Sequence, residues 1–589
     1  MRAGGNPVSS AAMRTPSLVT ASLAVVLLGL AWSLPGLRTP TGPVGGEATA
    51  ASAALSLRHD GDLVFYHGDL LRAYRQWDRG PAGLVLFTND AGATSFYGLP
   101  VTYPLLAAPF VGLLGSRGLL VLNAVLFVAM LWAAEKLFRG APGSGLFLAT
   151  FFLAGAAPGY ILRAEPVVLT MAGVFFALWF WWRRREREDE QRSGFLAASG
   201  AALAIAATTL PLAGLPGLAV LGDLALRRRW RGVLLLAAVF VGTALLLAAV
   251  QRHLTGEWTA FGGAQRRAFV DEYPSESARD LWQGAGSSEG SSFPGWRRAV
   301  RLAPRNAWYL LVGRNVGLLP YFPMALLALS LVAWTRLQRH RGALLLCVAA
   351  AAAIVVLRHP HDFGGGPGAL GSRFLAVLYP VFLFVPWQLA SRWRLGLALA
   401  AASLWAIPAT LASAMVPGAT VSRLPAFAAL PAELTHLRSL PGTVAHAWRD
   451  EVWVLPRQSF FVEEARPDGV WMRGASRAEV FVVSATPLDA LALRVHSLSD
   501  VNELKIESAG HTVRVRFDTE GKRGGTPFEV PLEPVARDVG FLPGISGESV
   551  YRLLIASTDG VVPARRGPQS GDQRLLGVFL EMTAEPGER

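Results

Sequence analysis

Acidic side chains gather in the polar stretch that follows the first apolar run of the chain. Glu47 lies near the start of this stretch, and Asp60 and Asp62 flank Gly61 further along. A carboxylate can remove the proton of a hydroxyl group while that oxygen forms a new bond, which is general-base catalysis. The apolar run, 18–35, is long enough to cross a bilayer once. We therefore expect these acids at a membrane surface, where they can act on a substrate carried by lipid.

Each acid also has a structural interpretation, which the residues alone leave open. Glu47 could be a solvated loop acid, and Asp60-Gly61-Asp62 could end a helix in a turn, since Asp and Gly favour turns. A third acid, Glu165, stands before Pro166, where it could favour a helix start through the helix dipole. The histidines show no fixed spacing of metal ligands, so we assign none of them to a metal site.

The composition indicates a membrane protein. Of the 589 residues, 52% are hydrophobic and only 16% are charged, and the mean hydropathy is +0.36. The net charge of +13 lies in short arginine clusters between apolar runs, which is typical of membrane topology and excludes a nucleic-acid surface. Cys347 is the single cysteine, so no intrachain disulfide can form. The arginine-rich, lysine-poor chain suggests a bacterial source.

The arginine clusters predict an orientation. The positive-inside rule places them in the cytoplasm; they are 183–185, 227–229, 336–341 and 392–394. Counting apolar segments from these clusters gives about eleven crossings. Segment 99–115 stays at the outer face in this count, because its prolines remove hydrogen bonds that lipid cannot replace. This count makes three regions extracytoplasmic: the first outer loop, 36–98, the segment with Glu165, and the C-terminal region. We expect the protein itself to lie in a bacterial inner (plasma) membrane.

Two other patterns define elements within this scheme. Segment 195–226 begins and ends near cytoplasmic clusters but is short for two spans, so we predict a broken hairpin that turns at 208–211. Beyond 452, apolar residues alternate in short runs separated by turn signals, which predicts strands; these runs are 480–483, 491–495, 513–517, 551–555 and 578–580. The chain is thus expected to form a polytopic α-helical membrane domain over 1–416. An all-β sandwich of roughly jelly-roll type should follow over 417–589, with Trp471 in its core.

The order of the motifs resembles the GT-C superfamily of membrane glycosyltransferases, which includes bacterial protein mannosyltransferases and the lipid A aminoarabinose transferase. Gly45-Gly46-Glu47 stands where such proteins have Gly-Asp-Glu, and Asp60-Gly61-Asp62 matches their Asp-Gly-Asp. Further motifs follow in the family's order; they are Tyr103-Pro104, Glu165-Pro166, Gly371-Ser372-Arg373 and Tyr379-Pro380. The resemblance extends over the membrane domain to about residue 416.

This resemblance implies an inverting transferase that moves a sugar from a polyprenyl-phosphate donor to an extracytoplasmic glycan, lipid or protein. The family's catalytic aspartate would fall at Gly46, so the resemblance makes Glu47 the first candidate for the base. The other candidate catalytic residues are Asp60, Asp62 and Glu165, and the candidate substrate-binding residues are Arg373, Tyr103 and Arg314. An arginine fork such as that of Arg373 fits the oxygens of a leaving phosphate. No resident cofactor is expected, a divalent metal is left open, and the sandwich is a candidate carbohydrate-binding domain.

Two other functions remain as alternatives. A transporter or flippase of lipid-linked sugars would need ionisable groups within its spans, whereas the acids of this chain collect between them. A non-catalytic membrane anchor for the C-terminal domain would explain why a glycine stands at position 46.

Overall fold

The chain divides into two compact units. The computed structural model describes residues 18–37, 45–77, 81, 84–88, 95–138, 144–187, 193–260, 266–269, 296–333, 338–366, 369–385, 393–404, 427, 429–439, 446–449, 452–457, 459–461, 469–499, 501–508, 510–517, 528–541, 547–565 and 572–583. The helical unit comprises 1–290, 322–348 and 376–415. The sandwich unit comprises 291–321, 349–375 and 416–589.

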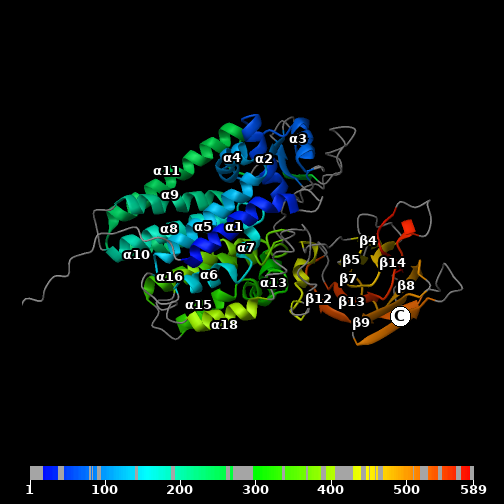
Figure 1. The fold of residues 1–589 in the computed structure, drawn as a ribbon. Helices are drawn as coiled ribbons and strands as arrows, with labels where there is room; N and C mark the ends of the chain where they lie inside the picture. The colour runs from blue at the N-terminus through cyan, green and yellow to red at the C-terminus, as the bar shows by residue number, and fades with distance from the viewer. Residues whose placement is uncertain are drawn as a thin grey trace, which may run out of the picture. The chain divides into compact units, whose positions relative to one another are not determined.

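The helical unit begins with a long apolar helix and a small mixed lobe (Figure 1). Its first helices are α1 (Leu18–Leu37), α2 (Gly46–His59) and α3 (His67–Trp77). Strand β1 (Leu84–Thr88) pairs antiparallel with β2 (Ser95–Tyr97) and with β3 (Arg266–Phe269). The described part of the predicted first loop therefore contains two helices and two strands. Alanine is the best helix former, and the many alanines of α2 explain why this stretch is helical.

The remaining helices of this unit pack on one another, and not only on their neighbours in the chain. They are α4 (Thr102–Leu114), α5 (Arg117–Glu135), α6 (Ser144–Leu153), α7 (Ala157–Ile161), α8 (Val167–Arg187), α9 (Ser193–Thr209), η1 (Pro211–Gly214), α10 (Pro216–Leu226), α11 (Trp230–Thr255), α15 (Pro323–Ala333), η2 (Tyr379–Leu383) and α18 (Trp393–Ser403). For example, α9 packs on α11, and α18 packs on α6 and α15. Helices α16 (Arg339–Arg358) and α17 (Arg373–Ala376) run from one unit into the other. The break between α9 and η1 confirms the predicted turn at 208–211.

Among the described residues, three helices are long and apolar enough to cross a membrane. They are α5, α11 and α16, and α11 exposes most of its apolar side chains, as a lipid-facing helix does. The described helices thus do not show the eleven crossings expected from the sequence. The apolar segment 308–334, for example, is counted as one crossing among the eleven. It is interrupted after α13 (Trp296–Val312), and a single turn, α14 (Leu318–Tyr321), follows before α15. Glycine and proline in this stretch explain the interruption.

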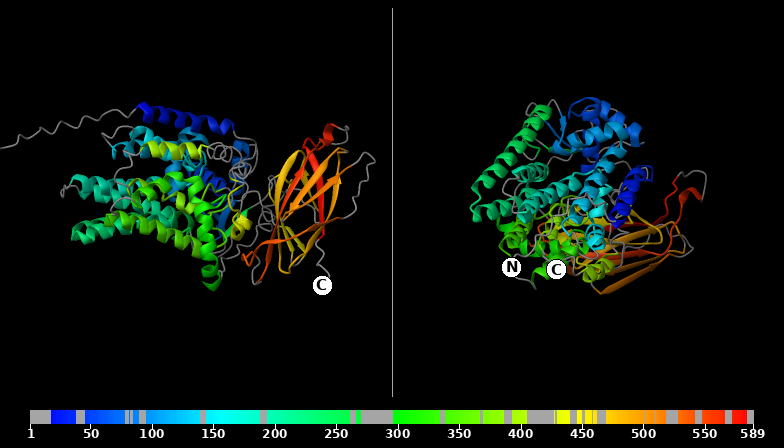
Figure 2. Two further views of the ribbon diagram at one scale, coloured as in Figure 1. Left: turned by 90° about the horizontal axis from the view of Figure 1, so that it is seen from below. Right: turned by 60° about the vertical axis from the view of Figure 1, so that its left-hand side comes forward.

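The sandwich unit contains two antiparallel sheets (Figure 2). The larger has seven strands in the order β10-β9-β13-β7-β5-β4, with β12 paired to β13, and the smaller has the order β11-β8-β14-β6. The strands are β4 (His446–Arg449), β5 (Val452–Arg457), β6 (Gly469–Arg473), β7 (Ser476–Ser484), β8 (Ala490–Ser497), β9 (Glu503–Ser508), β10 (His511–Arg516), β11 (Phe528–Pro531), β12 (Pro534–Arg537), β13 (Ser549–Ser557) and β14 (Leu576–Thr583). The short helical turns η5 (Leu434–Ser439) and η7 (Pro563–Arg565) complete the unit.

One hydrophobic core lies between the two sheets. Val480 and Leu553 of the larger sheet and Leu493 and Val578 of the smaller sheet belong to the same buried cluster. All five predicted strand segments lie in or overlap strands of this unit, so the period-two pattern was correctly interpreted. The expectation for Trp471 is wrong, because its neighbour Met472 enters the core while Trp471 is partly exposed.

Candidate functional site

Glu47 lies in the first turn of α2 and is only 5% exposed. The amide of Ala164 donates a hydrogen bond of 2.9 Å to Oε1 of Glu47. The residue before the helix, Gly45, has φ +64°, a conformation that favours glycine. Thr49 fixes this end of the helix, because its hydroxyl donates to the carbonyl of Gly45 and accepts from the amide of Val85 in β1, both at 2.9 Å. Glu47 is therefore not a solvated loop acid.

The link between α7 and α8 completes a buried polar cluster around Glu47. Arg163 and Glu165 in this link are each 5% exposed. The side-chain amide of Asn123 in α5 donates to the carbonyl of Arg163 at 2.6 Å. The hydroxyl of Tyr103 in α4 donates to Oδ1 of Asn123 at 3.3 Å. Burial raises the pKa of the Tyr103 hydroxyl well above its usual range, and the carboxylates of Glu47 and Glu165 act in the same direction. We call Glu47, Tyr103, Asn123, Arg163 and Glu165 the carboxylate cluster.

Asp60 and Asp62 lie at the other end of α2, about 20 Å along the helix from Glu47. Arg72 Nη2 donates to both oxygens of Asp60, at 3.1 and 2.8 Å. Oδ1 of Asp62 accepts the amide hydrogen of Val64 at 3.1 Å and lies 3.3 Å from the Ser56 hydroxyl. These contacts give the pair the geometry of a helix-ending turn. The structure does not bring them to Glu47.

A third carboxylate near this turn was missed in the sequence. Asp69 is 5% exposed; its oxygens accept hydrogen bonds from the amide of Tyr66 and from Arg72 Nη1, each at 3.0 Å. Burial raises the pKa of Asp69 above its ordinary value, although these hydrogen bonds act in the opposite direction. Burial, together with the charge of Asp69, raises the pKa of Tyr97 well above its usual range. The acid precedes Arg72 by three residues in α3, which in sequence is the pattern of an ordinary helix surface pair.

Arg314 and Arg373 belong to the sandwich unit, whereas the residues of the carboxylate cluster belong to the helical unit. Arg314 is 3% exposed, and its Nη1 donates to Oε2 of Glu479 in β7 at 2.8 Å. Its Nε and Nη2 both donate to the carbonyl of Leu430 at 3.2 Å. These contacts assign Arg314 a structural task within its unit. Arg373 begins α17, where its amide donates to the carbonyl of Gly364 at 2.8 Å.

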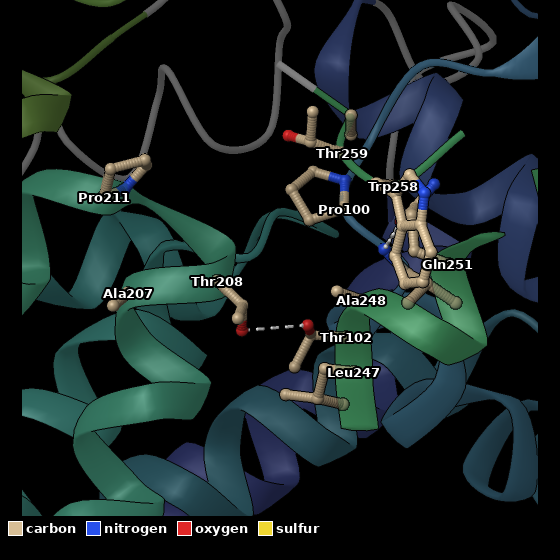
Figure 3. Close-up of a pocket in the computed structure, with 12 residues that line it drawn as sticks. Pro100, Thr102, Ala207, Thr208, Pro211, Leu247, Ala248, Gln251, Trp258 and Thr259 are labelled. Carbon is tan, nitrogen blue, oxygen red and sulfur yellow. Dashed lines mark hydrogen bonds between the residues drawn. The ribbon is translucent and has the colours of Figure 1, made fainter. Parts of the chain in front are cut away.

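A cavity of about 200 Å³ lies beside the start of α4 (Figure 3). The segments that line it are 100–102, the end of α9 with Pro211, the last turns of α11, and 258–260. The hydroxyls of Thr102 and Thr208 are 3.3 Å apart across it, and Oε1 of Gln251 accepts the amide hydrogen of Val101 at 2.8 Å. Trp258 is 56% exposed at its edge. Hydroxyl groups, an indole and apolar walls in one cavity suit an amphipathic ligand.

The cavity and the carboxylate cluster share α4. Thr102 lines the cavity, and the next residue, Tyr103, belongs to the cluster. Within the described residues, no group of three or more His, Cys, Asp or Glu side chains could hold a metal ion. Comparison of the chain with protein-family models, with curated proteins and with solved structures found no match.

Proposed function

We propose that this protein is a membrane glycosyltransferase of the GT-C type. It moves a sugar from a polyprenyl-phosphate donor to a glycan, lipid or protein acceptor outside the cytoplasm. The observation that supports this proposal most is the 2.9 Å hydrogen bond that joins Glu47 to Ala164, the neighbour of Glu165. Two segments that resemble the first and second acidic motifs of this superfamily therefore meet in one cluster.

The reaction needs a base, a leaving group and a place for the donor. The base removes the proton of the acceptor hydroxyl while its oxygen attacks the anomeric carbon, and the polyprenyl phosphate leaves with the electrons of the broken bond. Glu47 is the first candidate for this base, and Glu165 is the nearest other acid in the cluster. The cavity beside Thr102 supports the proposal, because a lipid-linked sugar is amphipathic and the cavity has both kinds of wall.

The proposal includes a location and a topology. We propose that the first loop and the C-terminal region lie on the extracytoplasmic side of a bacterial plasma membrane, and the positions of the arginine clusters support this orientation. This topology needs more membrane crossings than the three membrane-length helices provide. Shorter apolar helices such as α9 would supply the additional crossings. A cysteine introduced at the exposed Val501 of the sandwich unit should react with a membrane-impermeant thiol reagent in intact cells. Reaction only after lysis would contradict this orientation.

The activity can be tested with the purified full-length protein and a panel of polyprenyl-phosphate sugars. Release of polyprenyl phosphate that depends on an added acceptor is the expected result. Glu47→Gln and Glu165→Gln should reduce this release. Asp60→Asn is the matched control, because Asp60 lies at the far end of the same helix and is partly exposed. If Asp60→Asn alone removed activity, the base would be Asp60 instead.

One observation favours a second candidate, a non-catalytic membrane module. Glu47 is buried, and one of its oxygens is bonded to a backbone amide, as in a structural carboxylate. Gly46→Asp separates the two functions. It places a carboxylate where the resemblance expects one, at the start of a helix, where the dipole favours an acid. A wild-type protein that is inert with every donor, and a Gly46→Asp variant that turns over, would support the second candidate.

A further inference from the structure

The smaller sheet of the sandwich unit carries an aromatic row on the face that points away from the core. Val578 and Leu580 of β14 enter the core, so Phe579 between them lies on the opposite face. The strand register pairs Phe579 with Trp471 of β6 on one side and with His496 of β8 on the other. Three rings therefore lie side by side across three neighbouring strands.

The three rings lie next to one another in a row and are tilted relative to one another. The ring centroids of Trp471 and Phe579 are 5.3 Å apart, and those of His496 and Phe579 are 6.2 Å apart. Gly469 makes room for this arrangement, because a Cβ at that position would lie only 2.7 Å from Cζ of Phe579. The Phe579 ring thus leans over a position that has no side chain. All three rings keep partial exposure, so they are accessible on this face.

Charged groups lie beside the aromatic row on one side. Glu581, two residues beyond Phe579, pairs in register with Arg494 of β8. Its carboxylate lies 3.7 Å from Nη1 of Arg494 and 3.7 Å from Nε2 of His496. The carboxylate, guanidinium and imidazole together offer both hydrogen-bond donors and acceptors next to the aromatic row. One acid set against one arginine and a histidine gives nearly balanced charge, unlike the basic stripe of a nucleic-acid surface.

The outward face of the larger sheet is different, because the protein itself covers part of it. Phe481 of β7 and Val550 of β13 pack there with Leu437, Val539 and Phe541 in a second buried cluster. Trp471 and Phe579 belong to neither of these two clusters. The two outward faces therefore differ. That of the larger sheet packs against other parts of its own unit, and that of the smaller sheet presents aromatic rings with polar partners.

We propose that the row Trp471–Phe579–His496, with Glu581 and Arg494, binds a glycan chain. A sugar ring has an apolar face of C–H groups, which packs on an aromatic ring, and a rim of hydroxyls, which need donors and acceptors at its edge. Balanced polar groups beside a narrow row of rings match this chemistry better than they match an apolar protein surface. Glycan binding at this site does not depend on sugar transfer. The further idea that the bound glycan is the acceptor rests on the proposed function.

The test is binding of soluble oligosaccharides to the immobilised full-length protein. The panel contains oligomers of glucose, mannose, N-acetylglucosamine and a uronic acid. We expect at least one class to be retained, and Trp471→Ala and Phe579→Ala each to weaken its binding about tenfold or more. Trp471→Phe keeps a ring and should bind within a few-fold of the wild type. Leu554→Ala is the control, because Leu554 is 37% exposed on the larger sheet and its loss should change nothing.

Two results would overturn the proposal: no retention of any oligosaccharide, or wild-type affinity in both alanine variants. A thermal unfolding curve for each variant excludes loss of the fold as the cause of weaker binding. The proposed transferase is tested separately, through release of polyprenyl phosphate to a small acceptor such as a monosaccharide glycoside. If the protein binds no glycan but still releases polyprenyl phosphate, the proposed glycan site is wrong and the proposed transferase stands. If it binds glycan but releases no polyprenyl phosphate, the glycan site stands and the proposed transferase is wrong.

Discussion

The Ala164 amide donates a hydrogen bond to Glu47 Oε1 at 2.9 Å, although the two residues are 117 positions apart in the chain. This contact joins the start of α2 to the link before α8, and both sides of it are buried. This hydrogen bond has two consequences for Glu47. The carboxylate stands beside Glu165 and Tyr103, and its removal affects the fold as well as any chemistry.

Glu47→Gln is therefore expected to reduce turnover by about two orders of magnitude, because an amide is not a general base. Glutamine keeps an oxygen that can accept from the Ala164 amide, so the fold should persist. Glu47→Ala removes the acceptor and should lower the free energy of unfolding by roughly 1–3 kcal/mol. Turnover and thermal unfolding in detergent are measured on both variants. Unchanged turnover in the glutamine variant would exclude Glu47 as the base.

Asn123→Leu should destabilise the helical unit by roughly 1–3 kcal/mol, because Asn123 is fully buried and serves two groups. Its loss leaves the Tyr103 hydroxyl and the Arg163 carbonyl without this partner. Tyr103→Phe is the comparison, since it removes one hydroxyl and leaves the Asn123–Arg163 bond in place. Chemical unfolding curves should rank the wild type above Tyr103→Phe and Tyr103→Phe above Asn123→Leu. The reverse order of the two variants would show that the Asn123 bridge is not a stabilising contact.

Glu479→Leu should cost more stability than Arg314→Met. Glu479 is bonded to two arginines, Arg314 at 2.8 Å and Arg552 at 2.7 Å. Removing the acid leaves the buried Arg314 without its charged partner in this pair, which costs roughly 3–5 kcal/mol in comparable sites. Removing Arg314 leaves Glu479 still paired with the more exposed Arg552. Resistance of the sandwich unit to limited proteolysis gives the ranking, and equal effects of the two changes would contradict this account.

Asp69 should make stability depend on pH in the acid range. Its folded pKa is raised above the ordinary value of 3.8, so the folded state holds the proton more tightly than the unfolded state. The contribution to stability is then full below the unfolded pKa and is lost as the pH rises through the folded pKa. Asp69→Asn cannot titrate and should lack this slope. Unfolding curves from about pH 4 to about pH 7 compare the two proteins, and identical pH profiles would count against the raised pKa.

Ala248→Trp should fill the cavity beside Thr102 and, if the protein is the proposed transferase, raise the KM for the lipid-linked donor. Ala248 lines the cavity from α11. Leu245→Trp is the matched control, because Leu245 lies one turn away on the same helix and is 60% exposed. The control should bind donor like the wild type. An equal rise of KM in both variants would indicate a general effect on α11 and not occupation of the cavity.

The sequence by itself located strands of the sandwich and the break after α9. Alternation of apolar residues located strands such as β7 and β13, because successive side chains of a strand point to opposite faces. Thr209 and Pro211 marked the break after α9, because proline cannot continue a helix. Apolar length alone does not register the interruptions that glycine and proline introduce after Val312, so the described helices there do not form the one continuous span that was expected.

Tertiary structure decided which of these residues meet. Asp60 and Glu47 are near in sequence, but a regular helix holds them at its two ends. Glu47 and Glu165 are far apart in sequence, and only the packing of α2 against the link before α8 joins them. Trp471 lies in an apolar run, Val470-Trp471-Met472, whose pattern does not tell which side faces the core. The pleat sends Met472 inward and Trp471 outward, because the sheet packs on its partner through one face only.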